Sequence, residues 1–165
     1  MDSRTSHGQE EAQMSGKKIL IIDDDRHLLL GLTARLKACG YKVICAMDGI
    51  SGITLAHQEA PDLVILDLGL PGDDGFLVLE RMRKLADLVA TPVIVLTARG
   101  PADNDQRSLE AGAVAFFQKP TDNYQFLTAI RQTLGEAREL SSFLKPESCG
   151  ERRGVASLWS GKRPE

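Results

Sequence analysis

Five short apolar runs recur along the chain, and each is followed by polar or turn-forming residues. They are rich in Ile, Val and Leu and cover residues 19–22, 41–46, 63–66, 91–96 and 113–118. A continuous apolar run of this length, bounded by turn signals, is typical of a strand buried on both faces of a parallel sheet. The pattern therefore predicts five buried parallel strands.

Segments with apolar residues at helical spacing separate these runs. They cover residues 26–39, 48–59, 75–86, 102–111 and 122 to about 140. The first carries a stripe of Leu29, Leu32 and Leu36, which is typical of a helix with one face on a core. Strands that alternate with helices predict an α/β fold, a doubly wound parallel sheet with helices on both faces. Right-handed crossovers favour the flavodoxin-like strand order 2-1-3-4-5.

The third and fourth predicted helices differ in how clearly the sequence defines an apolar face. In the third, Phe76 and Ala86 mark the ends of one predicted apolar face. The fourth is very polar, and Leu109 with a few alanines would anchor it, so we expect it to be the least firmly held.

Two aspartates are expected to cap helices. Asp25 and Asp122 directly precede the first turn of the first and the last predicted helix, where a side-chain oxygen can accept backbone N–H groups.

Composition and charge narrow the function class. The chain has 165 residues, a net charge of −3 and three cysteines, Cys39, Cys45 and Cys149, without a metal-binding spacing. These values predict one soluble, cytoplasmic domain of ordinary size over residues 17–140, with neither nucleic acid nor a membrane as a partner. We expect residues 1–16 to be a disordered leader and 141–165 a flexible tail, too short for a DNA-binding output domain.

Polar residues follow four of the apolar runs directly. Asp23 and Asp24 follow the first, Asp67 the third, Thr97 the fourth and Lys119 the fifth. Because carboxyl ends of parallel strands meet at one sheet edge, these side chains are expected to gather there. Crowded carboxylates raise one another's pKa and are offset by a cation, and Mg²⁺ suits an all-oxygen site. The set predicts a phosphoryl receiver with a carboxylate nucleophile, Asp67.

The sequence resembles a two-component response regulator receiver domain of the CheY-like, stand-alone kind. The resemblance rests on five segments in the family's order: Ile19–Asp25, Pro61–Asp67, Leu70–Gly75, Val93–Ala98 and Phe116–Pro120. It implies a CheY-like fold that accepts a phosphoryl group from a sensor histidine kinase or a histidine phosphotransfer protein. Phosphorylation would change the conformation of the surface formed by the fourth helix, fifth strand and fifth helix. Whether phosphorylation also drives homodimerisation is left open.

The resemblance also assigns the metal site. Asp67 matches the phosphoacceptor, Asp23 and Asp24 match the acidic pair that holds Mg²⁺, and the backbone carbonyl of Gly69 would complete the protein ligands. Many relatives carry a larger side chain at the position of Gly69, so the lifetime of the phosphoryl group is open.

Four further positions follow from the same resemblance. Thr97 matches the switch hydroxyl, Phe116 the aromatic switch position and Lys119 the lysine of the family, whose bond to Pro120 would be cis. Arg99, two residues past the threonine, is a second position that influences the phosphoryl lifetime.

Two other functions compete with this one. Haloacid-dehalogenase-like phosphatases also form an aspartyl phosphate, but they carry an acid/base aspartate where this chain has Gly69. We therefore expect a phosphoacceptor and not an enzyme that turns over external substrates. A phosphorylation-independent interaction module is disfavoured because all five site residues are present. His27 and His57 are expected to be ordinary side chains without a phosphoryl role.

Overall fold

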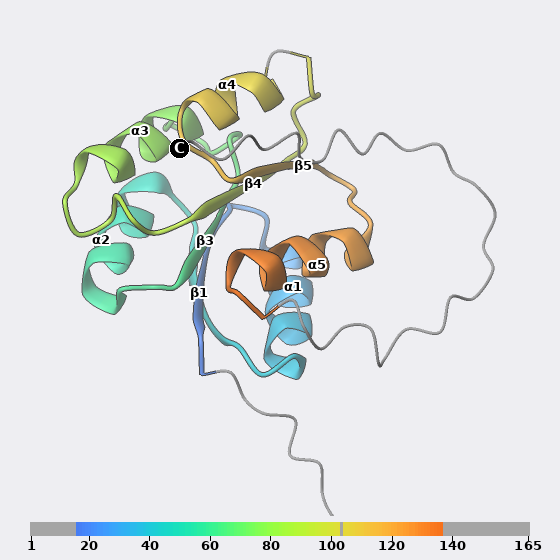
Figure 1. Cartoon of the computed structure of the whole chain (residues 1–165). Helices are drawn as coiled ribbons and strands as arrows, with labels where there is room; N and C mark the ends of the chain where they lie inside the picture. The colour runs from blue at the N-terminus through green and yellow to red at the C-terminus, as the bar shows by residue number, and fades with distance from the viewer. Residues whose placement is uncertain (1–15, 103, 137–165) are drawn as a thin grey trace, which may run out of the picture.

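Five parallel strands form one sheet in the computed structural model, which describes residues 16–102 and 104–136. The strand order is β2-β1-β3-β4-β5 (Figure 1), so the predicted flavodoxin-like topology is confirmed. The strands are β1 (Lys18–Ile22), β2 (Lys42–Ala46), β3 (Leu63–Leu66), β4 (Val93–Thr97) and β5 (Ala115–Gln118).

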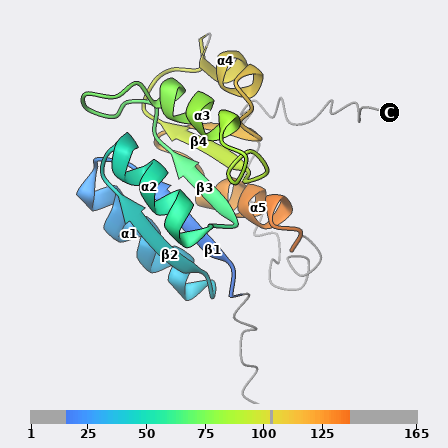
Figure 2. The same cartoon turned by 90° about the vertical axis from the view of Figure 1, so that its left-hand side faces the viewer.

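Helices cover both faces of this sheet. They are α1 (Arg26–Ala38), α2 (Gly49–Glu59), α3 (Gly75–Lys84), α4 (Asn104–Glu110) and α5 (Asn123–Thr133). Helices α1 and α5 lie on one face, and α2, α3 and α4 lie on the other (Figures 1 and 2). This is the three-layer arrangement that right-handed crossovers give when the strand order reverses direction, as it does here after β2.

The two apolar clusters follow from strand alternation. Leu20 and Ile22 of β1 point toward the side of α2 and α3, whereas Ile19 and Ile21 point toward α1 and α5. All four side chains are fully buried, because successive residues of a strand face opposite sides and both sides are covered. The continuous apolar runs of the sequence therefore reflect burial on two faces. The edge strand β2 is an exception, since most of its residues are partly or fully exposed.

Aspartates begin four of the helices. Asp25, Asp48, Asp74 and Asp122 each accept backbone N–H groups of the first turn. The two predicted caps, Asp25 and Asp122, are thus confirmed, and they satisfy amide groups that have no partner within the helix.

Two predicted details of the packing are wrong. Helix α3 ends at Lys84, Ala86 is exposed, and Leu88 instead is buried in the turn that follows. In α4 the expected anchor Leu109 is 50% exposed, whereas Ser108 is fully buried and donates its hydroxyl to the carbonyl of Asn104. Because the hydroxyl of Ser108 is hydrogen-bonded within its own helix, this small side chain can be buried, and the adjacent Leu109 then points to solvent.

Several expectations concern residues that the structure does not describe. The leader over residues 1–16, except Gly16, and the tail over 141–165 with Cys149 lie outside the described ranges, as does the end of the last helix expected near residue 140. Among residues 16–102 and 104–136, no helix has the length and apolar character needed to span a bilayer.

Candidate phosphoryl-acceptor site

Strand register brings the acidic residues together. In the sheet Ile22 pairs with Leu66, so Asp23 and Asp67, the next residue of each chain segment, leave the sheet side by side. The amide of Asp23 donates to Ala46 at 3.0 Å, and the amide of Asp67 donates to Ile22 at 2.9 Å. The backbone on both sides of the site is therefore fixed by the parallel ladder.

Lys119 connects the two buried carboxylates. Its Nζ donates to Oδ2 of Asp23 at 2.6 Å and lies 3.3 Å from Oδ2 of Asp67. Asp23 is 2% exposed and Asp67 6% exposed, while the lysine side chain remains 17% exposed. One ammonium thus serves two carboxylates, so the pocket keeps an excess of negative charge.

This geometry shifts the pKa of two of the groups. Burial raises the pKa of the Asp23 carboxyl above its ordinary value, against the opposing effect of the hydrogen bond from Lys119. Burial alone would lower the pKa of Lys119, but its bond to Asp23 and the charges of both carboxylates raise it above its ordinary value. Lys119 therefore stays a cation in a site where Asp23 is costly to ionise.

Asp24 adds a third carboxylate. One oxygen each from Asp23, Asp24 and Asp67 lies within 4.8 Å of the others, and Asp24 is exposed to solvent. A cluster of hard oxygen donors, open to water on one side, fits Mg²⁺, which keeps several waters when bound. The three predicted carboxylates therefore lie together, and their role as metal ligands stays a prediction. Gly69 lies beside them, with its amide donating to Oδ1 of Asp67 at 3.0 Å, and metal binding by its carbonyl stays a prediction.

The end of β4 supplies a hydroxyl. Thr97 is fully buried, and its Oγ1 accepts the amide of Arg99 at 3.3 Å. Its carbonyl accepts the amide of Lys119 at 2.7 Å, which ties the end of β4 to the loop after β5. The bond between Lys119 and Pro120 is cis, as expected. The predicted switch residue Phe116 lies half-buried in β5 against the cluster of α2 and α3.

Comparison with known proteins decides the family. Residues 19–131 match the response regulator receiver domain family. The chain belongs to that family. The receiver domain is 36% identical over 121 residues to sporulation initiation phosphotransferase F of Bacillus subtilis, covering 73% of this chain and 96% of that protein.

Two other relatives bear on function. The receiver domain is 40% identical over 117 residues to the DNA-binding dual master transcriptional regulator RpaA of Synechocystis, covering 71% of this chain and 48% of that one. It also resembles, with a TM-score of 0.67 and 26% identity, the receiver domain of the Pseudomonas aeruginosa sensor histidine kinase PA1611, which has a magnesium ion in its active site cleft. That match covers 73% of this chain and 99% of the other.

The lengths of the relatives differ. The receiver domain spans about half of RpaA but nearly all of phosphotransferase F. Receiver domains therefore occur among these relatives both within DNA-binding regulators and nearly alone. The expectation that this chain works without a DNA-binding output domain stays a prediction.

Two features near the site were missed from the sequence. Arg99 approaches the carboxylate of Asp74 at 3.8 Å, which links the loop after β4 to the start of α3. Gly75 packs so closely on the loop after β3 that an added Cβ would lie 2.5 Å from the Cα of Leu68 and 2.6 Å from the carbonyl oxygen of Asp67. In the sequence, the only sign of this close approach is that Gly75 directly follows the turn-forming residues after Asp67.

The two described histidines lie apart from this chemistry. His27 is exposed in the first turn of α1, and His57 is exposed near the end of α2, where it contacts Asp87. Both are surface side chains, and the expectation that they have no phosphoryl role stays a prediction.

Proposed function

We propose that this receiver domain is a phosphorylation switch in which Asp67 accepts a phosphoryl group from a phosphohistidine of a sensor histidine kinase or a histidine phosphotransfer protein. The observation that carries the proposal is the grouping of Asp67, Asp23 and Lys119 at one sheet edge, with a buried hydroxyl on the neighbouring strand. Each group has a distinct part in the transfer.

The nucleophile is a carboxylate oxygen of Asp67. A phosphorus–oxygen bond to that oxygen forms while the phosphorus–nitrogen bond to the donor imidazole breaks, and the imidazole keeps the electron pair. Lys119 faces the charge that develops on the transferred oxygens, since its ammonium already lies 3.3 Å from Asp67. The hydroxyl oxygen of Thr97 accepts a long hydrogen bond from the amide of Arg99 at 3.3 Å. On phosphorylation the hydroxyl would leave this bond and donate to a phosphoryl oxygen.

Asp23, Asp24 and Asp67 would hold the divalent cation, with the carbonyl of Gly69 as a further ligand. When bound, Mg²⁺ would offset the charge of the carboxylates and of the phosphoryl oxygens. The receiver neighbour with magnesium in its cleft supports this assignment. Asp23 would remain oriented by the amide of Asp25, which donates to its Oδ1 at 2.9 Å.

The domain would not turn over external substrates. A haloacid-dehalogenase-like phosphatase needs an acid/base aspartate two residues past its nucleophile, and here that position is Gly69, which has no side chain to donate or accept a proton. Phosphorylation would instead shift a two-state equilibrium of α4, β5 and α5, starting from Thr97 and Phe116. We propose that the readout is a changed protein surface in the cytoplasm, with dimerisation through this surface as one form of it.

The proposal is tested by intact-protein mass after incubation with acetyl phosphate. We expect one added phosphoryl group in the presence of Mg²⁺, none in EDTA, and none for Asp67→Asn in either condition. Asp87→Asn, an exposed carboxylate outside the site, is the matched control and should be labelled like the wild type. Equal labelling of wild type and Asp67→Asn would overturn the assignment.

A further inference from the structure

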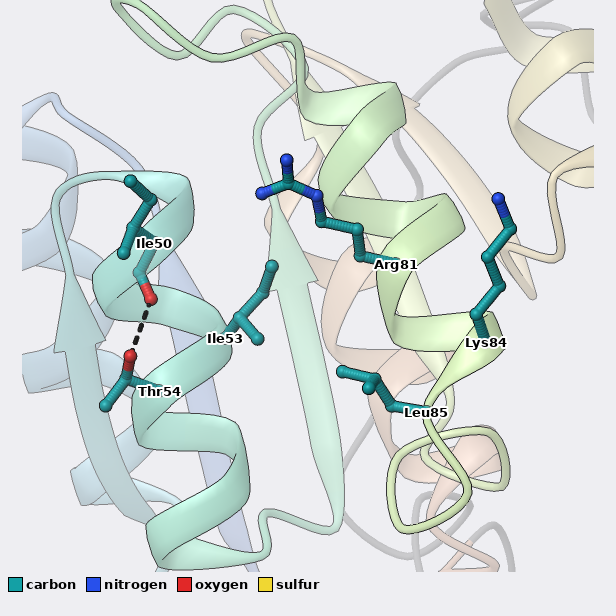
Figure 3. A pocket seen from close by; sticks show the side chains of 6 residues that line it. All are labelled: Ile50, Ile53, Thr54, Arg81, Lys84 and Leu85. Carbon is teal, nitrogen blue, oxygen red and sulfur yellow. Dashed lines mark hydrogen bonds between the residues drawn. The ribbon is translucent and has the colours of Figure 1, made fainter.

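A groove separates α2 and α3 on the face of the sheet that they share (Figure 3). Its volume is about 280 Å³, and none of its lining residues belongs to the acidic site. The lining consists of three residues from each side: Ile50, Ile53, Thr54, Arg81, Lys84 and Leu85.

The floor and one rim of the groove are apolar. Ile53 of α2 and Leu85, which follows α3, are half-buried and project toward each other across the gap (Figure 3). Ile50 is 65% exposed, which is a large exposed fraction for a bulky aliphatic side chain. The hydroxyl of Thr54 donates to the carbonyl of Ile50 at 2.9 Å, so it is already satisfied within its own helix. These four residues thus offer a hydrophobic surface with little hydrogen-bonding capacity of its own.

The other rim is basic. Arg81 and Lys84 are exposed on α3, and Figure 3 shows Arg81 extended from α3 toward α2. Within the described part of the receiver domain, neither side chain makes an ion pair. Arg83, between them in sequence, differs, because its guanidinium bonds the carbonyls of Val89 and Gly112. Both cations therefore lack a carboxylate partner among the described residues: Arg81 reaches over the groove, whereas Lys84 extends from the side of α3 that faces away from α2 (Figure 3).

These features select one kind of occupant. The volume is just below the ~300–1,000 Å³ of small-molecule sites, and the polar lining is limited to a hydroxyl bonded within its own helix and two exposed cations of α3, which do not enclose a cofactor. A channel between two neighbouring helices instead matches the ridge of a third helix, whose apolar side chains would enter at helical spacing. The unpaired cations would attract carboxylates on the flank of such a helix.

We propose that the α2–α3 groove binds an acidic amphipathic helix of a protein partner. Ile50, Ile53 and Leu85 receive the apolar side chains, and Arg81 and Lys84 pair with the carboxylates. The concave shape favours a helix over a lipid surface, which would call for a protruding apolar edge. The groove is separate from the α4–β5–α5 surface, so this binding does not depend on phosphorylation of Asp67.

The test is a titration of the isotopically labelled full chain, followed by amide chemical shifts. The probe is a synthetic peptide with Leu at helical spacing and Glu at the remaining positions. One control peptide carries Lys in place of Glu, and another carries Gln in place of Leu. Vesicles of anionic phospholipid form a separate arm. All titrations are repeated with Asp67→Asn, which removes the phosphoacceptor.

We expect saturable shift changes confined to residues 49–59 and 75–85, in both wild type and Asp67→Asn. Ile50→Ser, at a largely exposed position, should weaken binding roughly 5- to 10-fold through lost apolar contact. The double variant Arg81→Gln/Lys84→Gln should weaken it about 3- to 10-fold, and the control Lys37→Gln/Lys42→Gln, on exposed positions of α1 and β2, should not.

Three outcomes would overturn the proposal: shift changes that lie on another face, equal binding of the Lys peptide, or binding to vesicles without binding to the Glu peptide. A loss of phosphorylation in the acetyl phosphate assay would leave this proposal standing, because the groove contains none of the phosphoryl-acceptor residues.

Discussion

Lys119 is the residue whose removal tests the electrostatics of the site most sharply. In Lys119→Met the aliphatic length is kept, but Asp23 and Asp67 lose the ammonium that lies 2.6 Å and 3.3 Å from their oxygens. Removing one partner of a buried ion pair costs about 3–5 kcal/mol, because it leaves an uncompensated charge in the interior. Asp23 can relieve part of that cost by taking up a proton, so we expect the free energy of unfolding of Lys119→Met to be about 3 kcal/mol lower than that of wild type at neutral pH.

The loss should depend on pH and on metal. The pKa of Asp23 is raised, so as the pH falls through it the carboxylate is neutralised and the variant regains stability relative to wild type. The pKa of Lys119 is also raised, so its contribution is complete below its ordinary value and is lost as the pH rises through the folded value. The deficit of Lys119→Met is therefore largest between these two limits. Mg²⁺ at millimolar concentration should shrink it.

Urea denaturation followed by circular dichroism measures this deficit in EDTA and in Mg²⁺. Lys42→Met, at an exposed position of β2, is the control and should be near neutral. The reasoning is refuted if Lys119→Met matches Lys42→Met in EDTA, or if its deficit does not change between acidic and neutral pH.

Three further predictions concern other parts of the fold. Gly75→Ala should lower the free energy of unfolding by about 2 kcal/mol and slow phosphorylation, because the added Cβ would lie 2.5 Å from the backbone of Leu68. An unchanged urea denaturation curve and an unchanged rate of labelling by acetyl phosphate would contradict this. Tyr41→Phe removes the 2.6 Å hydrogen bond that the hydroxyl donates to Glu136, and should lower the free energy of unfolding, measured by urea denaturation, by about 1–2 kcal/mol. Burial raises the pKa of Tyr41, so wild type should lose stability above about pH 10, where the unfolded tyrosine ionises, and a similar loss in the variant would argue against this. Arg107→Gln removes a cation 3.8 Å from the ring of Phe76 and should speed amide exchange in α4 roughly 2- to 5-fold, leaving α5 unchanged.

The sheet and the acidic site could be predicted because both depend on local patterns. Each buried strand is a continuous apolar run, and its last residue must lie at the carboxyl edge whatever the details of packing. Asp23, Asp67, Thr97 and Lys119 therefore met in the structure as expected. The roles of Asp67 as phosphoacceptor and of the acidic cluster as a Mg²⁺ site were inferred from the residue types, whereas the switch roles of Thr97 and Phe116 came from the family resemblance. All of these roles await the labelling experiments.

Side-chain anchoring of the helices could not be predicted in the same way. The sequence of α4 favoured Leu109 as its anchor, but Ser108 is buried and Arg107 stacks on Phe76 of α3. The anchoring of this helix thus comes partly from an arginine, whose position over a ring depends on how two helices approach each other. Arg83 is a similar case, since its carbonyl partners lie in turns remote in sequence. Periodicity identifies faces but carries no information on such pairings.

The central claim is that Asp67 itself forms the acyl phosphate. The direct measurement is reduction of the acetyl phosphate-treated protein with borohydride, which converts an aspartyl phosphate to homoserine, followed by peptide mapping by mass spectrometry. The account predicts homoserine at position 67, only after treatment in the presence of Mg²⁺. Homoserine at position 23 or 24 instead, or label at 67 that is unaffected by EDTA, would contradict it.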